Sequence, residues 1–206
     1  MGRTAPFHEP RTPGLSGACR TLAIAGAVLL TGAPALAQVV GPVSARVADL
    51  TAGLFCAPPE GGRRPAPDTM TGWIHVPDEP VRMVAEGNEA PAVLGMGFGV
   101  RYAIAPGTDL VTRYTVTHPP IPPSGITEQH WDGMALAGGG DTAFFQFDVP
   151  EELQPGTWTF SVEAGGETLF TMAFTVRAAQ DLPALASLCR GGALLSANPS
   201  GRGAAG

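Results

Sequence analysis

The sequence contains no lysine, because all twelve of its basic residues are arginine. The longest basic run is Arg63-Arg64, and eighteen acidic residues give the chain a formal charge of −6. Nucleic acids and anionic membranes attract clustered positive charge, so we expect neither as a partner of the mature protein. Catalytic signatures are also missing, since no serine stands in a Gly-x-Ser-x-Gly arrangement. We therefore assign no catalytic residue and expect no cofactor.

A phosphate loop is excluded on similar grounds. The pattern Gly95-x-Gly97-x-Gly99 lies inside an alternating strand pattern, whereas a nucleotide fingerprint needs its glycines between a strand and a helix. Glycines inside a strand are more typical of close backbone packing or a bulge.

The N-terminal region has the three parts of a secretory signal peptide. Arg3, Arg11 and Arg20 precede an apolar run at residues 22–30, and Ala35-Leu36-Ala37 supplies the small residues of a cleavage site. The run is shorter than a membrane span requires. We predict that residues 1–37 are removed and that the protein is periplasmic or secreted, although an uncleaved anchor is the alternative.

Cleavage after Ala37 leaves 169 residues, with nine arginines against seventeen acidic residues and a formal charge of −8. Two cysteines, Cys56 and Cys189, remain. In an oxidising compartment an even number of cysteines favours a disulfide, here one that closes a loop of 133 residues. Two separate thiols, free or buried, are the alternative.

The clearest structural signal is a hairpin pattern between residues 153 and 176. Its two arms, 157–162 and 170–176, alternate between large apolar and small side chains, so each presents one apolar face. Gly165 and Gly166 between the arms supply the positive φ angles of a tight turn. A lone hairpin is marginal in water, so a second sheet must cover this face. The face consists of Trp158, Phe160, Val162, Phe170, Met172, Phe174 and Val176.

The rest of the chain contains further short strands separated by proline and glycine turns. Strands are predicted at 52–56, 71–76, 80–85, 96–104, 110–117 and 142–149, with loops at 58–68 and 127–140. Only residues 181–189 are expected to form a helical turn. The pattern predicts an all-β fold, an immunoglobulin-like β-sandwich of about seven to eight antiparallel strands.

This interpretation divides the chain into four parts. Residues 1–37 are the signal peptide, and residues 38–50 are a linker or a loosely held first strand. Residues 51–177 form the β-sandwich domain. Residues 178–206 are a C-terminal tail, and its last part, almost entirely Gly, Ala and Ser, is predicted to be disordered.

Four short motifs resemble a domain of unknown function found in exported Gram-negative bacterial proteins. They are Gly53-Leu54-Phe55-Cys56, Pro67-Asp68-Thr69 with Gly72, Gly97-Phe98-Gly99, and Pro155-Gly156-x-Trp158-x-Phe160. The resemblance extends over residues 51–176. It implies an immunoglobulin-like sandwich but no known activity, so it assigns no functional residue.

Two weak site candidates remain. His118, His130 and Met134 offer ligands that suit copper, although no His-x-His or Met-x-x-Met spacing brings them together in the sequence. Trp131 lies in the predicted loop, where it either packs against the edge of the sandwich or serves as an exposed recognition residue.

The sequence thus favours a non-enzymatic interaction or structural module with a protein partner in the cell envelope. The partner would dock on residues 119–140 or on an open sheet edge. One alternative is periplasmic handling of copper or another metal through His and Met. The other is a hydrolase, which would need a deep pocket lined by carboxylates or histidine.

Overall fold

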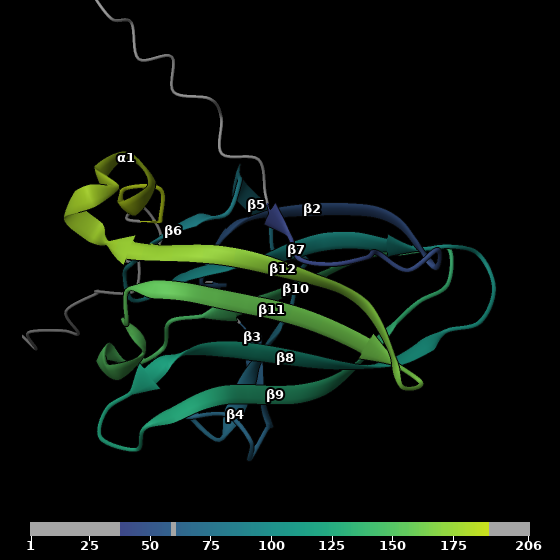
Figure 1. The fold of residues 1–206 in the computed structure, drawn as a ribbon, viewed down its shortest axis with the longest axis horizontal. Coiled ribbons are helices and arrows are strands. Elements are labelled where there is room, and N and C mark those ends of the chain that lie inside the picture. Colours follow the sequence, from purple (N-terminus) through teal and green to yellow (C-terminus); the bar gives the residue numbers. More distant parts are fainter. Residues whose placement is uncertain (1–37, 59–60, 190–206) are drawn as a thin grey trace, which may run out of the picture. The chain divides into compact units, whose positions relative to one another are not determined.

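A computed structural model describes residues 38–58 and 61–189 of the protein (Figure 1). These residues form two main β-sheets and a separate two-stranded hairpin. The predicted signal peptide and the glycine-rich end of the predicted tail lie outside the described residues. Within the described residues, no helix is both long and apolar enough to cross a membrane.

The first sheet has the strand order β1-β12-β11-β8-β9, and β6 also pairs with β12. Figure 1 shows its four long strands side by side. All pairs are antiparallel except β6 with β12, which is parallel and departs from the expected all-antiparallel arrangement. The strands are β1 (Gln38–Val39), β6 (Glu89–Ala92), β8 (Leu110–Ile121), β9 (Ile126–Ala135), β11 (Gly156–Ala164) and β12 (Glu167–Ala178).

The second sheet has the order β10-β7-β2-β5, and the separate hairpin pairs β3 with β4. Three short helical elements complete the fold, one after β10 and two after β12. The strands are β2 (Val47–Cys56), β3 (Gly61–Pro65), β4 (Trp73–Pro77), β5 (Met83–Glu86), β7 (Met96–Ile104) and β10 (Gly140–Gln146). The helical elements are η1 (Pro150–Glu152), η2 (Ala179–Asp181) and α1 (Pro183–Ala186).

The predicted hairpin is confirmed, and its apolar face forms half of the core. Trp158 pairs with Phe174, and both are fully buried. Phe98 of the second sheet packs on both rings, with centroid distances of 5.6 Å to Trp158 and 4.8 Å to Phe174. The two sheets therefore pack face to face, which confirms the all-β sandwich.

A row of glycines explains how the second sheet packs on its other face. Gly53 pairs with Gly99, and neither carries a side chain to fill the surface of β2 and β7. The Phe144 ring lies over Gly97 and Gly99 and stacks on the buried Phe55, with ring centroids 5.1 Å apart. The glycine motif is thus a packing device within the sheet, as its strand context predicts.

Several expectations about loops are wrong. The segment 58–68 contains strand β3, and 127–140 contains all but the first residue of the ten-residue strand β9. Strand β8 continues to Ile121 through the prolines at 119 and 120, and β6 was not expected. The described residues therefore hold twelve strands, several of them short, where seven or eight were predicted.

The ends of the sandwich differ in part from the predicted layout. Residues 38–50 hold β1 and the beginning of β2, so part of this segment is a strand of the second sheet. The tail contains the helical turn α1, as expected. It is held by a disulfide between Cys56 and Cys189, whose Cα atoms lie 5.3 Å apart. The two cysteines thus pair as the sequence predicts.

We expect the disulfide to stabilise the fold by about 2–5 kcal/mol, because it closes a loop of 133 residues in the unfolded chain. Urea unfolding of the wild type and of Cys56→Ala/Cys189→Ala would measure the difference. The mature oxidised protein, which lacks Cys19, should have no titratable thiol before reduction. Two reactive thiols in that preparation would contradict the pairing.

Gly99→Ala should destabilise the protein by about 1–3 kcal/mol, because its Cβ would overlap the backbone of Ala143 and Phe144. Gly62→Ala is the matched control, since a Cβ at this exposed β3 position meets nothing within 4 Å. Thermal or urea unfolding of both variants tests the packing. Equal stability of the two variants would show that the packing of Phe144 on β7 does not require glycine at position 99.

Candidate functional site

The described residues enclose a cavity of about 600 Å³ that lies beside β4, β9 and β10. The β4–β5 connection, residues 77–81, completes its lining. Four aromatic side chains, Trp73, Tyr114, Trp131 and Phe144, contribute to the wall. Cavities of roughly 300–1,000 Å³ with aromatic walls and a few polar groups are typical of ligand sites.

The cavity follows the edge of β10, which is the last strand of its sheet. Successive residues of a strand point to opposite faces, so Phe145 faces the sandwich core while Phe144 and Gln146 lie on the other face. All three line the cavity. The strand β4 supplies the facing wall through Trp73 and His75.

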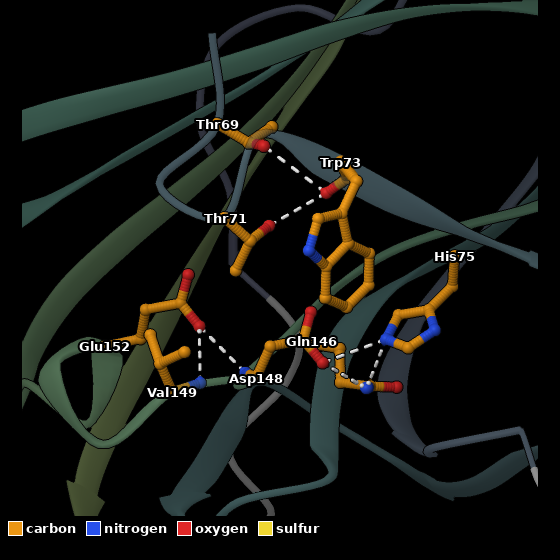
Figure 2. Close-up of polar contacts among 8 residues, drawn as sticks. All are labelled: Thr69, Thr71, Trp73, His75, Gln146, Asp148, Val149 and Glu152. Carbon is orange, nitrogen blue, oxygen red and sulfur yellow. Dashed lines mark hydrogen bonds and ion pairs between the residues drawn. The ribbon is translucent and has the colours of Figure 1, made fainter. Parts of the chain in front are cut away.

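A polar cluster joins the two walls. His75 Nε2 lies 2.8 Å from Asp148 Oδ1 and 2.7 Å from Gln146 Nε2 (Figure 2). Gln146 Nε2 donates to Asp148 Oδ1 at 2.6 Å. Because the amide nitrogen must face the carboxylate, Gln146 Oε1 is directed elsewhere, and it has no hydrogen-bond partner within the described residues.

Glu152 lies at the inner end of this cluster and is only 2% exposed. Its carboxylate accepts hydrogen bonds from the backbone N–H groups of Asp148, at 2.8 Å, and Val149, at 3.3 Å (Figure 2). Burial nevertheless dominates and raises the pKa of Glu152 to about 7. The carboxyl therefore changes its protonation near neutral pH.

A second acidic group, Asp141, lies on β10. Its Oδ2 atom accepts from the hydroxyls of Tyr102, at 3.1 Å, and Tyr114, at 3.2 Å, and these hydroxyls are 2.9 Å from each other. Burial raises the pKa of both tyrosines, so they remain protonated donors. The two hydroxyls therefore fix the orientation of the Asp141 carboxylate at the cavity wall.

The structure does not bring the candidate metal ligands together. His118 is buried on the inner face of β8, where its ring lies 4.6 Å from Trp158 and burial lowers its pKa. His130 occupies the opposite face of the same sheet, next to Asp68 at 3.4 Å, and Met134 is 58% exposed. Among the described residues, no group of three His, Cys, Asp or Glu is placed to hold a metal ion.

Trp131 lies on strand β9 and not on a loop. Its ring is half-buried, stacks on Tyr114 with centroids 5.8 Å apart, and packs edge-on against Phe160. It also lines the cavity. The ring therefore packs against the sandwich, as one interpretation holds, while its role in recognition stays a prediction.

The sequence did not point to Trp73, His75, Gln146 or Asp148 as site residues. His75 and Asp148 are 73 residues apart, so only the folded chain places them in contact. A usable signal was the alternation Trp73-x-His75 in a predicted strand, because two residues apart on a strand share a face.

The sequence that builds this site matches a known protein family. Residues 43–176 match the model of a family described as a domain of unknown function (DUF3859). The chain belongs to this family. The DUF3859 match includes every residue of the cavity lining but ends before Cys189. The family resemblance expected from the sequence motifs is thereby confirmed.

The chain was also compared with curated proteins and with solved structures. No curated protein matches this DUF3859 chain. Among solved structures, an immunoglobulin-like protein from Pseudomonas aeruginosa is similar at 22% identity, over 71% of this chain and 100% of that chain, with a TM-score of 0.40.

The raised pKa of Glu152 predicts a pH-dependent stability. The folded protein holds this proton up to about pH 7, whereas the unfolded carboxyl releases it near its ordinary value of 4.5. The stability from this proton is present below that value and is lost as the pH rises to about 7. Relative to Glu152→Gln, the wild type should lose up to about 3 kcal/mol between these limits.

Urea unfolding at constant ionic strength and several pH values measures this difference. Glu151→Gln is the matched control, because Glu151 is an exposed neighbour in the same short helix. A constant stability difference between the wild type and Glu152→Gln across the range would contradict the assignment.

Proposed function

We propose that this protein is an exported, non-enzymatic β-sandwich module that binds a partner in the cell envelope through the cavity beside β4, β9 and β10. One observation carries the proposal: Trp73 and Trp131 line the same cavity of about 600 Å³. Tryptophan is among the residues that contribute most to binding at protein interfaces. Export follows from the predicted signal peptide and agrees with the disulfide.

The arrangement of Trp131 supports recognition more than simple packing. Tyr114 and Phe160 hold the ring in one orientation, so little conformational entropy is lost when a ligand binds against it. Met134, three residues further along β9, is 58% exposed and also lines the cavity. A pre-oriented aromatic ring and an exposed methionine in the same lining are a suitable contact surface for a partner.

A hydrolase is the second candidate, because the cavity does contain carboxylates and the His75–Asp148 pair that such an enzyme would use. Two of the three threonine hydroxyls in the lining argue for binding instead. Thr71 donates to the backbone carbonyl of Trp73 at 2.9 Å, and Thr69 donates to that of Ala66 at 2.8 Å. Neither hydroxyl is directed at His75 as a nucleophile would be.

Site-specific photo-crosslinking in cells tests the proposal. We expect a crosslinker at Met134 of the full-length protein to give discrete products in the periplasmic fraction, and Trp131→Ala should reduce them several-fold. A crosslinker at Val84, which is 39% exposed on the distant strand β5, is the control. Identical products from both positions, or a protein retained in the cytoplasm, would overturn the proposal.

A further inference from the structure

We propose that the group entering the cavity is an organic cation: a guanidinium or ammonium group carried by a partner's side chain or by a free amine. This inference rests on the proposed function and adds the chemical class of the ligand. Three independent features of the lining support it, namely its charge, its unpaired hydrogen-bonding atom and its aromatic rings.

The charge of the lining has one sign. Five acidic residues contribute to it and no arginine does. Asp141 and Asp148 are partly withdrawn from water, yet among the described residues neither forms an ion pair with an arginine. Carboxylates in such a position gain strongly from a positive partner, because their water contacts are already reduced. The five are Asp78, Glu79, Asp141, Asp148 and Glu152.

Part of the hydrogen-bonding capacity that remains in the wall is that of acceptors. Gln146 is 8% exposed and lines the cavity, and its Oε1 atom has no partner within the described residues. The carboxylates of Asp141 and Asp148 can each accept further hydrogen bonds. Ammonium and guanidinium groups supply several N–H donors and no acceptor, so they match this wall.

The aromatic side chains suit the same ligand. The Arg63 guanidinium already stacks on the Trp73 ring, with Cζ 3.6 Å from the ring centroid. Trp131 adds a second indole to the wall, and tryptophan is the best cation–π partner among the side chains. Binding of organic cations between aromatic rings is an established functional use of this interaction.

Two other ligand classes fit less well. A metal ion would need at least three grouped ligands, and the described residues hold no such group. A neutral sugar could stack on the tryptophans, but it would leave Asp141 without a compensating charge and Asp148 with His75 alone. The chemistry of the wall therefore distinguishes a cation from both.

The three tryptophans of the sequence provide the test, because each gives one indole N–H signal in NMR spectra. The mature protein is titrated with acetyl-Gly-Arg-Gly-amide, its Gln and Glu analogues, n-butylamine and glucose. The cationic probes should shift the signals of Trp73 and Trp131, and their binding should weaken at high salt. The Trp158 signal is the internal control, since this ring is fully buried and its N–H is bonded to Gln154.

Variants connect the binding to the carboxylates. Asp148→Asn should weaken the binding of whichever cationic probe binds the wild type at least tenfold. Asp132→Asn, on the outer face of β9 and outside the lining, should leave it unchanged. Thermal unfolding confirms that both variants fold. Asp141→Asn repeats the test at a site where the asparagine oxygen can still accept from the tyrosine hydroxyls.

The outcomes separate this inference from the proposed function. Binding of the arginine peptide alone supports a partner's side chain, and binding of n-butylamine alone supports a free amine as the source. Equal binding of glucose or of the Gln and Glu peptides would overturn the cationic ligand and leave the cavity as a binding site. Crosslinks at Met134 with no response to any cationic probe would do the same.

Discussion

The contact of Trp158 with Phe98 and Phe145 holds the two sheets together, and the rest of the structure depends on it. The ring centroids of Trp158 lie 5.6 Å from Phe98 and 5.2 Å from Phe145, which belong to the opposite sheet. The indole N–H donates to Gln154 O at 2.9 Å, so the whole side chain can be buried with its polar atom satisfied. The cavity lies beside the edge strands β9 and β10, with Tyr114 of β8 in its wall.

The fold was predictable for strands that carry their large apolar residues on one face. Strands β7, β11 and β12 alternate between large apolar and small residues, and this pattern alone fixes which face meets the core. Strand β9 was missed for the opposite reason. Its inward residues include Gln129, Trp131 and Gly133, which line the cavity and therefore do not form an apolar series. Strand β3 is fully exposed, so its sequence carries no burial pattern.

The site was less predictable than the fold because its parts come from distant strands. Trp131 attracted attention as a large aromatic ring among polar and glycine residues, and it does line the cavity. The cluster of His75, Gln146 and Asp148 depends on how the β3–β4 hairpin lies against β10, and no local pattern encodes that placement. The candidate metal ligands do not form one site, because β8 and β9 direct His118 and His130 to opposite faces of the sheet.

Folding alone does not account for the acidic wall. Glu152 caps two backbone N–H groups, which a glutamine oxygen could also do without the desolvation that raises the pKa of this carboxyl. Asp141 likewise uses two tyrosine hydroxyls, although an asparagine would accept them. The charge of Glu152 therefore brings a cost in stability without a structural benefit of its own. A ligand that carries the opposite charge would recover this cost on binding, so the carboxylates make sense as part of a recognition site.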